Sequence, residues 1–312
     1  MVAFTTLFNI NFIPQGICLI ESILRNVSNN PKVFVLCMDK DTYKILNLRF
    51  HNKITLISLS ELMDDELLQI KKERKFNEFC WTLTPTLIRY VAEKFNPENE
   101  VFYCDADTVF LKPADEIFAN FKNSNRSVYI TEHGYDPIYD QTATSGRYCV
   151  QLIGFSNAWQ NECLNYWEGE CRKWCFDRFE DGNFGDQKYL EDFETQFPGE
   201  IYVEPSLSYF QAPWNCNYYR NSDAVFFHFH SLRMASNNYV HLGHYEINKY
   251  TYEYIYLPYI RKLLDITNRL KEAGIYIEPQ ILIRSYIFLN IYSILSAMWR
   301  KLKINLNLRK VR

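Results

Sequence analysis

Several signatures of nucleotide and ester chemistry are absent from this sequence of 312 residues. It contains no Gly-rich phosphate loop of the P-loop or GxGxxG type and no GxSxG nucleophile elbow. Met1–Gly16 also lacks the Gly-rich, Lys/Arg-bearing loop that a nucleotidyltransferase normally carries there. These absences argue against P-loop and dinucleotide-binding proteins, serine hydrolases and nucleotidyltransferases.

Targeting and charge signals are equally sparse. The N-terminus has neither a basic segment nor a small-residue cleavage site, so the sequence predicts no signal peptide. A formal net charge of −3 argues against a general nucleic-acid binder. The apolar content of 47% is that of a globular protein. Nine cysteines, mostly inside apolar runs, are typical of buried thiols in a reducing compartment, so we expect a cytoplasmic protein.

The segment Val101–Pro113, VFYCDADTVFLKP, carries the clearest chemical signal. Asp105 and Asp107 follow a short apolar strand, and side chains two apart on an extended chain point to the same face. Two adjacent carboxylates at the end of a buried strand repel each other, and a hard cation such as Mn²⁺ or Mg²⁺ resolves that conflict. The alternative is a solvated turn that happens to contain two acidic residues.

Apolar periodicity predicts an α/β fold. Strands are expected at Val2–Phe8, Lys32–Met38 and Lys53–Leu59, with helices between them. This alternation implies parallel crossovers and a doubly wound sheet, which binds ligands at the carboxyl ends of its strands. Asn11 lies in the loop just after the first strand.

A helix is expected at Trp81–Phe95, with Thr84 as its N-cap and Pro85 in its first turn. Arg89 lies on this helix. It is either a surface arginine with a packed stem or a cation near a bound nucleotide or the Asp pair.

Two later segments hold further candidates. Asp186 and Gln187 begin a predicted helix, where Asp186 is either an N-cap or a group that contacts substrate. The predicted strand Ala224–His230 points His228 and His230 to one face, a pattern compatible with metal binding or with structural histidines. Arg233 follows and could reach a phosphate.

The C-terminal part differs in character. Residues 249–270 read as a helix rich in Tyr, and Ile281–Leu302 as an amphipathic helix with a basic tail. The second helix is too interrupted by polar residues to span a bilayer. It is expected either to lie on an anionic membrane surface or to dock on the rest of the protein.

Together these segments resemble the GT-A nucleotide-diphospho-sugar transferases, and among them the glycosyltransferase family 8-like bacterial enzymes of surface polysaccharide assembly. The resemblance covers roughly Met1–Leu242. It rests on the opening strand and on the motifs FYCDADTVFLKP, YCVQLIGFSN, FGDQKYL and VFFHFHS.

The resemblance implies specific roles. Asp105 and Asp107 would hold Mn²⁺ on the donor diphosphate, and His228 matches the late histidine that completes the metal site. Asp186 and Gln187 match an Asp-Gln pair that faces the sugar and the acceptor. Asn11 would lie near the nucleobase or ribose. The sequence departs from the family after His228, where the usual Gly is Ser and the usual Lys-Pro-Trp is missing, so Arg233 is the nearest cation.

The predicted function is therefore a metal-dependent, retaining glycosyltransferase that moves a sugar from a UDP-linked donor to a saccharide or glycolipid. The alternatives are a nucleotidyltransferase and a catalytically silent carbohydrate-binding protein. The expected organisation is a mixed-sheet GT-A domain over 1–245, with a nucleotide-sugar half at about 1–113 and an acceptor half at about 114–245. A helical extension over 246–312 would place the protein on the inner face of the cytoplasmic membrane.

Overall fold

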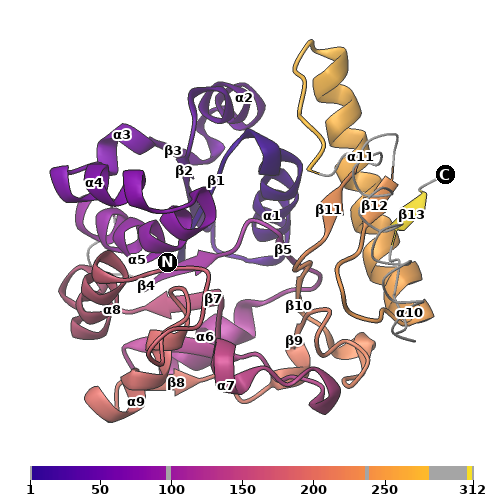
Figure 1. Cartoon of the computed structure of the whole chain (residues 1–312). Coiled ribbons are helices and arrows are strands. Elements are labelled where there is room, and N and C mark those ends of the chain that lie inside the picture. Colours follow the sequence, from indigo (N-terminus) through magenta and orange to yellow (C-terminus); the bar gives the residue numbers. More distant parts are fainter. Residues whose placement is uncertain (1, 96–99, 236–238, 281–307, 311–312) are drawn as a thin grey trace, which may run out of the picture. The chain divides into compact units, whose positions relative to one another are not determined.

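The computed structural model describes residues 2–95, 100–235, 239–280 and 308–310 (Figure 1). The chain forms two compact units, Met1–His228 and Phe229–Arg312. The predicted catalytic domain over 1–245 extends past this boundary, and its division into nucleotide-sugar and acceptor halves stays a prediction.

The first unit is built on a seven-stranded sheet in the order β3-β2-β1-β4-β7-β6-β8. The strands are β1 (Val2–Phe8), β2 (Lys32–Cys37), β3 (Thr55–Ser58), β4 (Glu100–Cys104), β6 (Val128–Glu132), β7 (Tyr148–Phe155) and β8 (Ile201–Val203). Strands β3, β2, β1 and β4 are parallel, whereas β7 runs antiparallel to both β4 and β6. This mixed sheet, flanked by helices, confirms the predicted fold class.

The longer helices follow the strands as the apolar periodicity predicts, because each buries an apolar stripe. The helices of the first unit are α1 (Ile13–Asn26), α2 (Lys40–Phe50), α3 (Leu59–Leu62), α4 (Asp65–Glu73), α5 (Phe76–Phe95), α6 (Asp115–Asn123), α7 (Thr142–Ser145), α8 (Glu162–Lys173) and α9 (Phe193–Gln196). Helices α5 and α8 share one large core cluster with the sheet, which includes the fully buried Leu87 and Trp167. On other strand positions, Phe102 packs edge-on against Phe118 of α6 and against Tyr129 of β6.

A smaller sheet in the same unit, ordered β5-β10-β9, positions the chemistry. Its strands are β5 (Thr108–Phe110), β10 (Phe226–His228) and β9 (Phe210–Gln211). Strand β5 starts directly after Asp107, and β10 pairs with it antiparallel so that His228 lies opposite Thr108. Helix α1 anchors β5, since Ser22 Oγ accepts a hydrogen bond from Phe110 N at 3.0 Å and Asn26 donates to Phe110 O at 2.7 Å.

The predicted start of the long helix is wrong. Helix α5 begins at Phe76, and Pro85 lies inside it rather than in its first turn. The side chain of Glu78 accepts a hydrogen bond from Lys75 N at 2.7 Å, so this carboxylate satisfies the true N-terminus. Thr84 Oγ1 instead donates back to Cys80 O at 3.4 Å, as a hydroxyl within a helix does.

The second unit begins with β11 (Arg233–Met234) and β12 (Tyr239–His241). Next along the chain come α10 (Lys249–Thr251), a π-helical segment (Tyr252–Tyr256) and α11 (Leu257–Glu272), and then β13 (Leu308–Lys310). The predicted amphipathic helix Ile281–Leu302 lies outside the described residues. Within the part of the chain that is described, no helix is both long enough and apolar enough to cross a membrane.

Gly154 of β7 tests how tightly the sheet packs. A Cβ atom there would lie 2.4 Å from the Phe102 ring, which is fixed by its aromatic neighbours. We expect Gly154→Ala to lower the free energy of unfolding by about 1–3 kcal/mol, as overpacked cores do. Urea denaturation measures this.

Gly169 provides the matched control, because a Cβ there would meet nothing within 4 Å and the residue lies inside α8. Gly169→Ala should stabilise by roughly 0.5–1 kcal/mol through helix propensity. Equal effects of the two substitutions would contradict the packing described for Gly154.

Candidate active site

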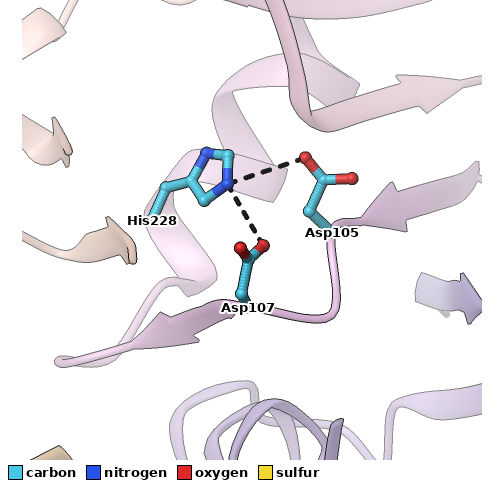
Figure 2. Close-up of side chains that lie close together, drawn as sticks. All are labelled: Asp105, Asp107 and His228. Carbon is cyan, nitrogen blue, oxygen red and sulfur yellow. Dashed lines mark ion pairs between the residues drawn. The ribbon is translucent and has the colours of Figure 1, made fainter. Parts of the chain in front are cut away.

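Asp105, Asp107 and His228 form a compact cluster (Figure 2). His228 Nε2 lies 3.1 Å from Asp107 Oδ1 and 3.9 Å from Asp105 Oδ2. One ligand atom from each residue falls within 4.8 Å of the others. The structure thus brings together the three residues predicted to hold a metal, although their role as ligands stays a prediction.

A tight turn between β4 and β5 creates this arrangement. Asp105 O accepts hydrogen bonds from Thr108 N at 3.2 Å and from Thr108 Oγ1 at 2.7 Å. Asp105 N remains tied to the large sheet through Gln151 O at 3.3 Å. The chain therefore leaves the large sheet at Asp105 and enters the small sheet at Thr108. Because β10 pairs with β5, His228 lies opposite Thr108 and close to the turn.

The donor set fits a divalent cation. Two carboxylates and one imidazole converge, and the Asp105 and Asp107 side chains keep 31% and 17% of their surface exposed while His228 keeps 6%. Oxygen ligands with one neutral imidazole suit Mn²⁺ and are compatible with Mg²⁺. Without a cation, two partly buried carboxylates with oxygens within 4.8 Å of each other repel.

The proton affinities reflect that crowding. Burial raises the pKa of Asp105 to about 7, the negative charge of Asp107 adds to the rise, and His228 opposes it. Burial alone would lower the pKa of His228, but the charge and hydrogen bond of Asp107 outweigh it and raise this pKa well above its usual value. The raised pKa values of Asp105 and His228 mean that bound protons reduce the net negative charge of the cluster.

Asp186 lies within electrostatic reach of this cluster. Its side chain is buried, and burial together with the charge of Asp105 raises the Asp186 pKa well above the usual range. The backbone is fixed because Trp167 Nε1 donates to Asp186 O at 2.7 Å. Gln187 donates to Ser145 O at 2.8 Å and so contacts the end of α7, in the segment before β7.

Arg89 has a different set of contacts. Its guanidinium forms a two-pronged ion pair with Glu168 of α8, in which Nη2 lies 2.8 Å from Oε1. Glu168 also accepts hydrogen bonds from Thr86 at 2.9 Å and from Arg172 at 3.2 Å. A nucleotide contact by Arg89 stays a prediction, and Glu168 is a partner that sequence reasoning missed.

The loop after β1 is braced from β2. Ile10 N donates to Asp39 Oδ2 at 2.8 Å, and Asn11 N donates to Asn9 Oδ1 at 3.2 Å. These backbone hydrogen bonds do not test the predicted contact of Asn11 with a nucleobase or ribose, which stays a prediction. Asp39 was missed because its position before α2 reads as an ordinary N-cap, which it also is.

The expectation that His228 and His230 share a strand face is wrong. Strand β10 ends at His228, and Ser231 turns the chain with a φ of +62°. His230 is exposed and lies, with Arg233, in the second unit. Arg233 Nη1 donates to Leu232 O at 2.9 Å, and its predicted phosphate contact stays a prediction.

Sequence reasoning also missed the residues packed around His228. Trp214 meets the His228 ring edge-on at 5.4 Å and the His133 ring at 5.3 Å. Cys149 of β7 interacts with both imidazoles. Burial would raise the pKa of Cys149, but these two histidines outweigh it and lower the pKa to about 6. The contact between Trp214 and His133, which lie 81 positions apart, cannot be seen in the sequence.

The pH dependence of folding stability tests the crowding at Asp105. Unfolded Asp105 releases its proton near 3.8 and the folded protein releases it at about 7, so stability is lost as pH rises between these values. Asp105→Asn does not titrate. In metal-free buffer we expect the variant to gain free energy of unfolding relative to wild type as the pH rises from about 4 to about 7.

Urea denaturation at each pH measures the difference, with Asp41→Asn at an exposed site as the control. A wild-type minus variant difference that does not change with pH would show that Asp105 is not held in a crowded site.

No family model matches the sequence. The uncharacterized protein YfnD of Bacillus subtilis (strain 168) is 30% identical over 251 residues, which cover 74% of this chain and 79% of YfnD. Among solved structures, the galactosyltransferase LgtC in complex with donor and acceptor sugar analogs superposes with a TM-score of 0.53 and 9% identity, covering 84% of this chain and 95% of LgtC. Mouse xyloside xylosyltransferase 1 has a TM-score of 0.50 and 11% identity over 74% of this chain and 98% of its own.

At such low identity the two solved structures show a shared fold, which confirms the predicted GT-A architecture. The narrower assignment to glycosyltransferase family 8 stays a prediction. Because the likeness to YfnD extends over most of both chains, the protein belongs to the same family as Bacillus subtilis YfnD, within the GT-A fold of glycosyltransferases.

Proposed function

We propose that this protein is a metal-dependent glycosyltransferase that moves a sugar from a nucleoside diphosphate donor, with UDP as the expected nucleotide, to a saccharide or glycolipid acceptor. The observation that carries the proposal is the convergence of Asp105, Asp107 and His228 at the end of the central strand β4. The shared fold with LgtC, solved with donor and acceptor sugar analogs, supports it. A role in surface polysaccharide synthesis is part of the proposal.

In such a transfer the main barrier is the negative charge that develops on the departing diphosphate. A bound Mn²⁺ or Mg²⁺ would stabilise the negative charge of the departing diphosphate. Asp105 and Asp107 would hold the ion through carboxylate oxygens and His228 through Nε2. Because the pKa of Asp105 is about 7, this carboxyl can lose its proton near neutral pH when a cation replaces it.

Asp186 and Gln187 are proposed to face the sugar. A buried carboxyl whose pKa is raised holds its proton longer and can donate a hydrogen bond to a sugar hydroxyl. Retention, which the family resemblance favours, needs no free base, whereas inversion would need a base to activate the acceptor, and Asp186 is then the first candidate. Asn11, Arg89 and Arg233 complete the proposed donor contacts.

Removal of one metal ligand tests the proposal. Asp107→Asn keeps the side-chain size but removes the charge, and it should lower Mn²⁺-dependent hydrolysis of UDP-sugars by about a hundredfold or more, because a metal contributes several kcal/mol to the transition state. The assay measures released UDP with and without Mn²⁺, and Asp41→Asn is the control at an exposed site.

The product distinguishes the alternatives. A glycosyltransferase releases a nucleoside diphosphate, whereas a nucleotidyltransferase releases pyrophosphate from a nucleoside triphosphate. A silent carbohydrate-binding protein releases neither, with any donor. Unchanged UDP release from Asp107→Asn would refute the assignment of the metal site.

The proposed membrane association depends on the basic tail of the chain. Seven basic residues follow Glu278 without an acidic one, and three of them are Arg300, Lys301 and Lys303. Changing these three to Gln removes three positive charges and should weaken binding to phosphatidylserine vesicles by roughly a hundredfold, at about 1 kcal/mol for each charge. This triple change leaves β13 in the chain, unlike a truncation.

Vesicle co-sedimentation measures the binding, and uncharged phosphatidylcholine vesicles are the control. If the wild-type protein stays in the supernatant with both kinds of vesicle, the membrane proposal is refuted.

A further inference from the structure

Trp81 of α5 lies beside the chain segment that leads into Asp186. A Cβ atom at Gly185 would lie 3.4 Å from Cε3 of the indole, so the backbone just before Asp186 passes close to this ring. Phe184 is a further neighbour, with its ring centroid 6.5 Å from that of Trp81 and the two planes at 43°. Both aromatic side chains are half-buried, so part of each one is accessible from outside.

The backbone beside this ring has a fixed course. Gly185 has a φ of +54°, a conformation that residues with side chains rarely adopt. Its N–H donates to Phe176 O at 3.1 Å, and the carbonyl of the next residue, Asp186, accepts from Trp167 Nε1 at 2.7 Å. These two hydrogen bonds hold the peptide that joins Gly185 to Asp186 in place beside Trp81.

Helix and strand geometry place Trp81 at the same edge of the sheet as the metal cluster. Helix α5 precedes β4 in the chain and contacts it, so the two elements run in opposite directions (Figure 1). From Trp81 to the end of α5 at Phe95 the helix rises about 21 Å. From Glu100 to Asp105 the strand extends about 17 Å. Trp81 and Asp105 therefore both lie toward the carboxyl end of β4.

The indole of Trp81 offers two kinds of contact. Its face is electron-rich and attracts the weakly positive C–H groups on one face of a sugar ring, as it attracts the edges of other rings. Its N–H is a hydrogen-bond donor, and among the described residues no group accepts a hydrogen bond from it. An accessible ring with a donor at its edge fits a pyranose, which presents C–H groups and hydroxyl oxygens side by side.

We propose that Trp81 is a platform on which the pyranose ring of the transferred sugar stacks, and that it helps to select the donor. This inference rests on the proposed function. A single bridging oxygen joins the sugar to the diphosphate, so a diphosphate bound through a cation at Asp105 and Asp107 keeps the sugar near that ion. Asp186, which is proposed to face the same sugar, directly follows Gly185, the residue beside the indole.

Substitutions at Trp81 separate stacking from packing. Trp81→Leu keeps a large apolar side chain but removes the aromatic face, whereas Trp81→Phe keeps an aromatic face and removes the N–H. We expect Trp81→Leu to weaken the binding of a UDP-sugar by about tenfold, as the loss of one aromatic contact does, and to change the affinity for UDP by less than about twofold. Trp81→Phe should stay within about threefold of wild type for both ligands.

Isothermal titration calorimetry of the full chain with Mn²⁺ measures the affinities for UDP and for four donors: UDP-glucose, UDP-galactose, UDP-N-acetylglucosamine and UDP-N-acetylgalactosamine. The donor that the wild-type protein binds most tightly is used for every variant. The ratio of the UDP-sugar affinity to the UDP affinity is the readout, because a purely structural change at Trp81 alters both affinities together.

Trp159→Leu is the matched control. Trp159 is 44% exposed and follows the end of β7, where Phe155 pairs with Val101 at the start of β4, so it lies at the opposite edge of the sheet. Circular dichroism checks that each variant is folded. If Trp81→Leu does not fold, Trp81→Met takes its place, since it also removes the aromatic face.

The outcomes are distinct. A wild-type protein that binds neither UDP nor any of the four donors refutes the proposed function and, with it, this inference. If the wild type binds UDP and a donor but Trp81→Leu leaves the affinity ratio unchanged, the proposed function stands and the platform is refuted. The platform is also refuted if the wild type binds UDP and none of the donors, or if Trp81→Phe lowers the ratio as much as Trp81→Leu does.

Discussion

Like-charge repulsion at the end of β4 is the constraint on which the rest of the site depends. Asp105 and Asp107 are held on one turn, partly buried, with an imidazole close to both. In that setting the free energy of ionisation is high, and the raised pKa of Asp105 expresses it. A site that keeps two such groups together without neutralising them costs stability, and stability alone gives no reason to place them there.

The fold accepts this cost because two independent ladders hold the cluster. Asp105 is bonded to β7 of the large sheet, and Thr108 pairs with His228 of the small sheet. A turn that joins both sheets cannot relax by moving one strand alone. Phe102 of β4 packs edge-on against Phe118 of α6, and Trp214 packs edge-on against the ring of His228. These contacts fix the strand and the imidazole. The cluster is therefore preorganised before any ligand binds.

Local sequence signals predicted the elements well and their contacts poorly. The strand that ends before Asp105 was evident because the apolar run and the Pro break are local, and the carboxylate pair was evident for the same reason. The family resemblance predicts His228 as a ligand. The prediction that His230 shares a strand face with it is wrong, because β10 ends at His228 and the chain turns at Ser231, a turn that depends on packing. Thr84-Pro85 resembles a helix start, but tertiary burial and the cap from Glu78 continued the helix through it. Glu168, Asp39 and Cys149 act through partners far away in sequence, which no window along the chain can reveal.

Charge balance explains why the predicted ligands belong together. Asp105, Asp107 and Asp186 carry three negative charges when ionised, and His228 offsets one of them when protonated. A divalent cation would offset two of the three negative charges and allow His228 to become a neutral ligand, which leaves one negative charge when all three carboxyls are ionised. A diphosphate then adds negative charge, which the acidic cluster cannot stabilise and which requires cations from the chain. Arg89 shares its charge with Glu168, so its approach to a phosphate would weaken that ion pair. The residues after His228 lack the Lys-Pro-Trp of the resembling family, so the source of the positive charge that a bound diphosphate would need stays open to experiment.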